Sequence, residues 1–186
     1  MTYAPGHEMV TEPVRWQMEV LEVVPRPDAG VVGYAMRGHP LDVAACSPLA
    51  TPQEYVFLQV NENRFYRAGI AVLPALKNPA ASLEGLLVDA QAVLDFPLVP
   101  EKRFCDPAMA REDALYCWYV CGETTFPWPP GGSMQQAVPS YQLCYQTNAD
   151  STVLTFTPGM GYTALHYQHH GSPCTVDLTL VEYFSP

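Results

Sequence analysis

The stretch "AVPSYQLCYQTNADSTVLTFTPGMGYTALHYQHHGSPCTVDLTL" (137–180) decides the fold class of this chain. Runs rich in Val, Thr, Tyr and Phe alternate with turn compositions, "NADS" (148–151) and "GSP" (171–173), as expected for short antiparallel strands. The stretch "TPGMG" (157–161) predicts a turn or a bulge that bends a long strand, because its glycines supply backbone freedom. The final run, 174–184, alternates apolar and polar residues, which is typical of a strand with one buried face.

The same pattern extends toward the N-terminus. Residues 15–24 and 31–38 read as two strands around the turn "PRPDAG" (25–30), and the apolar phase changes near Leu21, which predicts a bulge. Residues 54–73 read as two further strands around "NEN".

Only residues 79–96 are compatible with a helix, and Ser82 is its candidate N-cap. Gly85 and the apolar pair at 93–94 favour a strand equally, so both interpretations stay open. Nineteen prolines exclude long helices elsewhere. We therefore predict one domain over residues 1–186, mainly β: a single antiparallel β-barrel, half-barrel or strongly bent sheet with at most one helix.

The charge of the chain limits its partners. Nine Lys and Arg against nineteen Asp and Glu give a net charge of −10, which repels phosphate backbones and anionic lipid headgroups. We expect no nucleic-acid partner. Contact with a membrane is expected only through a removed anchor, because no run of eighteen apolar residues is present.

Cysteine usage points to an oxidising compartment. An even count in a Lys-poor, Tyr-rich chain is compatible with up to three disulfides, for which 15 pairings exist. The opening "MTYAPGHEM" has neither a basic nor an apolar signal region. We therefore expect the mature form of a secreted, periplasmic or cell-surface protein. The candidate disulfide cysteines are Cys46, Cys105, Cys117, Cys121, Cys144 and Cys174.

The spacing C-x₃-C in "CWYVC" (117–121) differs from the C-x-x-C of redox and zinc sites. On a strand the two sulfurs lie about 13 Å apart on one face, so they do not pair with each other. Cys105, Cys144 and Cys174 are the candidate partners, and buried free thiols are the alternative.

Three histidines cluster in "ALHYQHHGSPC" (164–174). On a strand, His166 and His170 face one side about 13 Å apart and His169 faces the other, so the pair does not chelate a metal. We expect no metal and no cofactor. The histidines read as polar positions of a strand and its turn, and His166 and His170 remain weak catalytic candidates.

Aromatic residues are the candidate binding groups. The loop "GETTFPWPPGGS" lacks the lysine of a phosphate-binding loop, and it reads either as a structured cap or as an aromatic platform. The candidate residues for ligand or partner binding are Phe126, Trp128, Trp118 and Tyr162.

The C-terminal third, about 70 residues, resembles a loose group of uncharacterised bacterial extracytoplasmic and lipoprotein domains. The resemblance rests on four segments: Thr124–Gly132, "FTPGMG" (156–161), Gly171 and Leu180–Tyr183. It implies a curved antiparallel sheet around a helix or a ligand, as in lipoprotein carriers, and no established chemistry.

The sequence favours a non-enzymatic extracytoplasmic module that binds an apolar small molecule or a protein partner, because aromatic residues on a curved sheet form an apolar lining. The alternative is a small β-barrel enzyme, cyclase- or hydrolase-like, that uses His166 or His170 with a carboxylate. An oligomer, or a subunit of a larger complex, is a third possibility.

Overall fold

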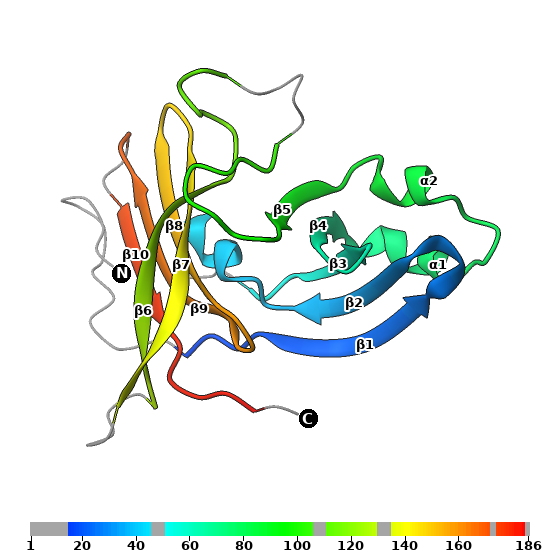
Figure 1. Cartoon of the computed structure of the whole chain (residues 1–186), viewed down its shortest axis with the longest axis horizontal. Coiled ribbons are helices and arrows are strands. Elements are labelled where there is room, and N and C mark those ends of the chain that lie inside the picture. Colours follow the sequence, from blue (N-terminus) through cyan, green and yellow to red (C-terminus); the bar gives the residue numbers. More distant parts are fainter. Residues whose placement is uncertain (1–14, 46–50, 106–110, 130–134, 172–173, 185–186) are drawn as a thin grey trace.

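The computed structural model describes residues 15–45, 51–105, 111–129, 135–171 and 174–184. Its strands form two five-stranded antiparallel sheets, each a meander in which sequential strands are neighbours. Figure 1 shows the second sheet standing steeply across one end of the first. The predicted antiparallel, mainly β class is therefore confirmed, with the strands divided between two sheets, neither of which closes into a barrel.

The first sheet has the order β1-β2-β3-β4-β5, and the second has the order β10-β9-β8-β7-β6. The strands of the first sheet are β1 (Glu19–Arg26), β2 (Val31–Arg37), β3 (Glu54–Val60), β4 (Arg64–Gly69) and β5 (Gln91–Asp95). The strands of the second sheet are β6 (Tyr119–Trp128), β7 (Gln136–Gln146), β8 (Asp150–Thr157), β9 (Gly161–His169) and β10 (Cys174–Thr179).

Helical structure in the described part of the chain is limited to helices of three to six residues. These are the 3₁₀ turns η1 (Pro27–Ala29), η2 (Pro40–Ala45) and η3 (Ile70–Val72), and the helices α1 (Leu73–Leu76) and α2 (Leu83–Leu87). The region 79–96 contains both alternatives, α2 followed by β5. The expected cap is present, since the Ser82 hydroxyl accepts a hydrogen bond from the Gly85 amide at 3.1 Å.

Two predicted backbone irregularities have different outcomes. The register between β1 and β2 shifts between Val20 and Glu22, where the apolar phase changes, which confirms the bulge. The segment Thr157–Gly161 does more than bend a long strand, because it is the hairpin turn that separates β8 from β9. Gly159 and Gly161 both have positive φ angles, 82° and 88°, which allow the chain to reverse there.

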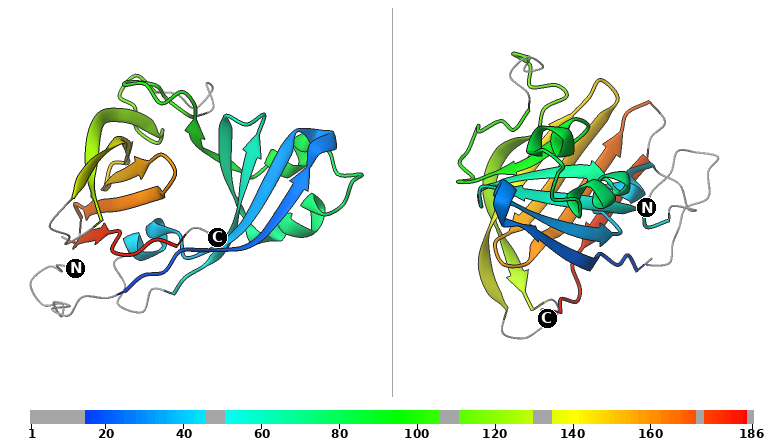
Figure 2. Two further views of the ribbon diagram at one scale, coloured as in Figure 1. Left: turned by 60° about the horizontal axis from the view of Figure 1, so that its bottom comes forward. Right: turned by 90° about the vertical axis from the view of Figure 1, so that its right-hand side faces the viewer.

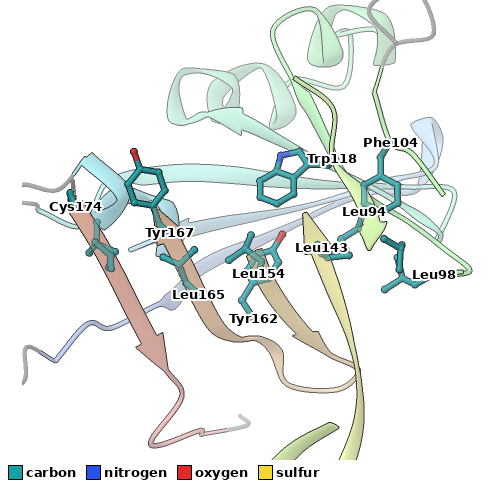
Figure 3. Close-up of a cluster of buried hydrophobic side chains, with 13 residues drawn as sticks. Leu94, Leu98, Phe104, Trp118, Leu143, Leu154, Tyr162, Leu165, Tyr167 and Cys174 are labelled. Carbon is teal, nitrogen blue, oxygen red and sulfur yellow. The ribbon is translucent and has the colours of Figure 1, made fainter. Parts of the chain in front are cut away.

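The two sheets share one of the two hydrophobic cores. The shared core takes most of its buried side chains from the second sheet and Trp118, and Leu94 of β5, with Leu98 and Phe104 after it, adds to them (Figure 3). Phe57 and Phe65 of the first sheet pack against this core. The second core lies between the other face of the first sheet and the helices, where α1 places Leu76 so close to Gly33 that a Cβ there would lie 2.0 Å from its Cδ2. In β3, Val56 and Leu58 belong to the helix side and Phe57 belongs to the shared core, as strand alternation requires.

Figure 2 shows the two sheets next to each other, with α1 and α2 beside the first sheet on the side away from the second. Within the described ranges, no helix is long and apolar enough to cross a membrane.

Candidate binding cleft between the two sheets

Strand pairing places a carboxylate opposite two of the three clustered histidines. On β9, His166 is exposed and His169 is half-buried, so they occupy opposite faces as predicted. The registers pair His166 with Asp177 of β10 and His169 with Asp150 of β8, and both Nδ1–Oδ1 distances are 2.7 Å.

The catalytic candidates do not lie in an enclosed site. The side chains of His166 and Asp177 are 50% and 72% exposed. The backbone amide of His170 donates to the Ala149 carbonyl at 2.7 Å, which places His170 at the strand end. Neither of the two hollows described below is lined by a histidine. Among the described residues, no group of three or more His, Cys, Asp or Glu side chains could hold a metal ion.

A cleft of about 290 Å³ opens between the sheets, next to Asp150. Four of its lining residues belong to the second sheet and its approach: Trp118, Tyr145, Thr152 and Tyr167. Leu41 of η2 and Gln91 of β5 form the opposite wall. Thr147 and Asp150, at the turn between β7 and β8, complete the lining.

The aromatic wall follows from sheet register. Tyr145 pairs with Thr152, and Thr152 pairs with Tyr167, so the three side chains form one row across β7, β8 and β9. The rings of Trp118 and Tyr145 pack against each other, with centroids 5.1 Å apart and planes inclined at 32°. Trp118 and Tyr167 stand on the same side of the sheet in Figure 3.

Asp150 organises the rim of the cleft. Its Oδ1 accepts hydrogen bonds from the Tyr167 hydroxyl at 2.6 Å and from His169 Nδ1, and its Oδ2 accepts one from the Thr147 hydroxyl at 3.0 Å. Burial alone would raise the pKa of Asp150, but these three hydrogen bonds outweigh it and lower that pKa. Burial, followed by the bond to the Asp150 carboxylate, raises the pKa of Tyr167, so its hydroxyl stays protonated and donates.

Disulfides adjoin both members of the aromatic pair. Cys105 is bonded to Cys117, which directly precedes Trp118, and Cys121 is bonded to Cys144, which directly precedes Tyr145. The two cysteines of C-x₃-C do not pair with each other, and their partners are two of the three predicted. The expected strand does not span both of them, because β6 begins at Tyr119 and Cys117 precedes it. Disulfide bonds persist in an oxidising compartment.

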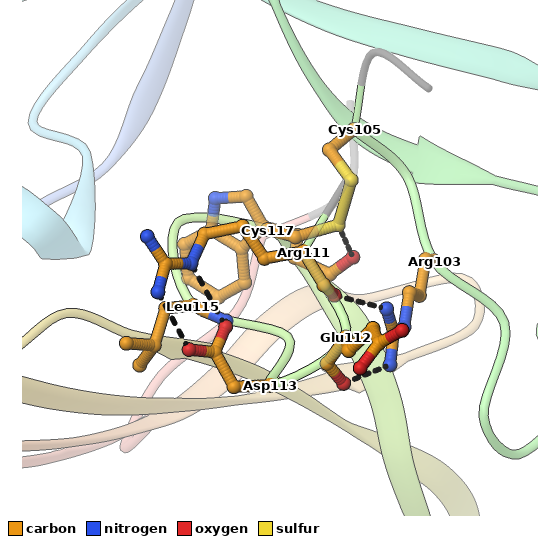
Figure 4. Close-up of a disulfide and its surroundings, with 8 residues drawn as sticks. Arg103, Cys105, Arg111, Glu112, Asp113, Leu115 and Cys117 are labelled. Carbon is orange, nitrogen blue, oxygen red and sulfur yellow. Dashed lines mark hydrogen bonds and ion pairs between the residues drawn. A yellow bond between two sulfur atoms is a disulfide. The ribbon is translucent and has the colours of Figure 1, made fainter. Parts of the chain in front are cut away.

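Two further cysteines complete the set. Cys174 is disulfide-bonded as well, and Cys46 lies outside the described residues. The loop between Cys105 and Cys117 is also held by Arg103, which donates to the carbonyls of Arg111 at 2.6 Å and Glu112 at 3.3 Å (Figure 4).

The four predicted binding residues do not gather in one place. Trp118 lines the cleft, but it is only 3% exposed and is also a buried member of the shared core. Phe126 and Trp128 stack on each other on β6, with ring centroids 6.2 Å apart, and neither lines the cleft. Tyr162 is buried in the shared core. The binding role of these residues stays a prediction.

Sequence reasoning did not find the buried polar group at the junction of the sheets. His39 is 1% exposed and lies edge-on to Tyr55 and Tyr162, with ring centroids 5.2 Å and 5.3 Å away. Its Nδ1 accepts a hydrogen bond from the Leu41 amide at 3.1 Å. Nearby, Arg67 pairs with Asp42 at 3.4 Å and lies over the Tyr55 ring at 5.4 Å. No local motif marks these residues, because three strands and a turn bring them together.

A second hollow of about 390 Å³ lies at the opposite end of the first sheet, beside the turns that follow β1 and β3. Prolines, valines and polar residues line it, and no aromatic ring does. The inter-sheet cleft is therefore the better candidate for recognition of a small molecule. Comparisons of the chain with protein-family models, with curated proteins and with solved structures give no match.

Proposed function

We propose that this chain is an extracytoplasmic binding module that holds a small molecule in the cleft between its two sheets. One observation carries the proposal: three aromatic rings, Trp118, Tyr145 and Tyr167, line a cleft next to a carboxylate whose position three hydrogen bonds fix. An apolar wall combined with a few fixed polar groups is the usual composition of a ligand pocket.

Rigidity supports the same function. The disulfides beside Trp118 and Tyr145 limit the movement of the wall, so the ligand meets a surface that is already formed. They also favour a secreted, periplasmic or cell-surface location over the cytosol.

The experiment uses the indole N–H resonances of the three tryptophans. In ¹⁵N-labelled protein, a library of small fragments should shift the Trp118 resonance in a saturable way. The Trp16 resonance is the internal control, because its Nε1 donates to the Gly38 carbonyl at 2.8 Å, outside the cleft lining. Fragments that shift only Trp16 or Trp128, and leave Trp118 unchanged across the library, would contradict the proposal.

A further inference from the structure

The cleft offers hydrogen-bonding groups that the protein itself does not use. Within the described residues, four lining side chains make no hydrogen bond to the protein, and none of their polar atoms is sealed from solvent: Gln91, Trp118, Tyr145 and Thr152. Together they present an indole N–H, two hydroxyls and a carboxamide, which include donors and acceptors. A ligand that matches these groups replaces water without losing hydrogen bonds.

The charge of the cleft selects against ions of either sign. Its lining contains one carboxylate, Asp150, and no Lys or Arg, so an anionic ligand would be repelled. A cation gains little, because Tyr167, His169 and Thr147 already donate hydrogen bonds to the Asp150 carboxylate. The lining therefore suits a neutral ligand.

The apolar surface and the size restrict the ligand further. Tyr145 and Leu41 are half-buried, whereas Trp118 and Tyr167 are only 3% and 9% exposed, so Tyr145 and Leu41 offer most of the apolar contact in the cleft. The volume of about 290 Å³ lies just below the usual range for ligand pockets, roughly 300–1,000 Å³, so only a small ligand fits. One saturated ring with hydroxyl groups around its edge fits both properties, since such a ring has apolar C–H faces and hydroxyls that donate and accept.

From these steps we infer that the ligand is a neutral saccharide and that the cleft holds one pyranose-sized ring. The ring lies against Trp118 and Tyr145, and its hydroxyls bond to Gln91, Thr152, the Trp118 indole N–H and the free acceptor capacity of Asp150 Oδ2. This inference rests on the proposed function, because it names the class of ligand for the same site.

The experiment titrates ¹⁵N-labelled protein with the methyl glycosides of glucose, galactose, mannose and N-acetylglucosamine. Tetramethylammonium chloride, sodium benzoate and indole serve as cationic, anionic and apolar probes. We expect at least one glycoside to shift the Trp118 indole resonance in a saturable way while the Trp16 resonance stays in place. The three other probes should leave Trp118 unchanged.

Two matched variants test the placement of the ligand. Thr152→Val removes a hydroxyl from the cleft at nearly constant shape and should weaken glycoside binding about fivefold, the value of one neutral hydrogen bond. Thr155→Val makes the same change on the same strand, at a residue that does not line the cleft, and should leave affinity unchanged. Far-ultraviolet circular dichroism confirms that both variants are folded.

The outcomes separate the two proposals. If only tetramethylammonium, benzoate or indole shifts Trp118, the cleft binds small molecules and the saccharide inference is wrong. If glycoside affinity is the same in Thr152→Val and wild type, the sugar lies elsewhere and the inference is also wrong. If no probe moves a resolved Trp118 resonance, both the inference and the proposed function are contradicted.

Discussion

The rings of His39 and Tyr55 lie edge to face, with centroids 5.2 Å apart and planes at 80°, and both polar tips are sealed inside the protein. Neither His39 Nε2 nor the Tyr55 hydroxyl has a hydrogen-bond partner among the described residues. Protonation of His39 would add an uncompensated charge to this interior. Burial, and secondarily the nearby Arg67 cation, lower the pKa of His39 from 6.5 to about 3.

This buried imidazole predicts acid sensitivity. Because the pKa of His39 is lower in the folded state, its contribution to stability is complete above pH 6.5 and decreases as the pH falls toward 3. Below pH 6.5, His39 lowers the free energy of unfolding by about 1.4 kcal/mol for each pH unit, which gives about 2 kcal/mol between about pH 7 and pH 5. Urea unfolding of wild type and His39→Asn at these two pH values measures it.

The free energy of unfolding should differ less between about pH 7 and pH 5 in His39→Asn than in wild type, and the reduction should be about 2 kcal/mol. His166→Asn, which changes an exposed imidazole, is the control and should retain most of the wild-type dependence. Equal pH dependence in wild type and His39→Asn would show that His39 does not resist protonation in the folded state.

The Asp150 network predicts a second effect at lower pH. In the folded protein the pKa of Asp150 is lowered, so its contribution is present above the unfolded value of 3.8 and is lost as the pH falls through the folded value. Asp150→Asn should lower the free energy of unfolding at neutral pH by about 1–3 kcal/mol, since it weakens hydrogen bonds to a charged acceptor. The difference in unfolding free energy between wild type and Asp150→Asn should become smaller in acid, because Asp150 is then protonated in the wild type as well.

Denaturant titrations at neutral pH and below about pH 3 compare these proteins. Asp177→Asn is the matched control, because the side chain of Asp177 is 72% exposed and its pair with His166 is worth at most about 1 kcal/mol. If Asp150→Asn and Asp177→Asn lower the free energy of unfolding equally at neutral pH, the hydrogen bonds to Asp150 stabilise the protein no more than an exposed ion pair does.

The disulfide between β6 and β7 should be a large contributor to stability. Replacing Cys121 and Cys144 together by Ala opens a loop with a sequence separation of 23 and should cost about 3 kcal/mol. The pair Cys105 and Cys117, with a separation of 12, should cost slightly less. Guanidinium unfolding measures both, and near-ultraviolet circular dichroism reports the packing of Trp118 on Tyr145. A wild-type midpoint unchanged by strong reductant would contradict this expectation.

Gly38 should not tolerate a side chain. Its φ is +82°, and a Cβ there would lie 2.0 Å from the backbone carbonyl oxygen of Gln17. We expect Gly38→Ala to lower the free energy of unfolding by more than about 2 kcal/mol, because strain and overlap add. Gly69→Ala, where nothing lies within 4 Å of the added Cβ, should change it by less than about 1 kcal/mol. Similar thermal midpoints for the two variants would contradict the assigned backbone conformation at Gly38.

Much of the local structure was readable from the sequence, because its causes are local. The side-chain period of 2 predicted the strands and placed His166 and His169 on opposite faces. The phase change near Leu21 predicted the bulge, and the Ser82 cap predicted the helix start. The prediction that Cys117 and Cys121 do not pair with each other was confirmed, although the strand assumed for both begins only at Tyr119.

Tertiary structure decided everything that depends on which strands meet. Register between β8 and β9 joined Asp150 to His169 and aligned Tyr145, Thr152 and Tyr167 in one row. Leu41 of η2 and Gln91 of β5 face the second sheet and form the other wall of the cleft. The same packing of the two sheets buries His39, which no local sequence motif indicates. Periodicity fixes the face on which a side chain lies, but the partner on that face depends on long-range packing, to which distant parts of the chain contribute together.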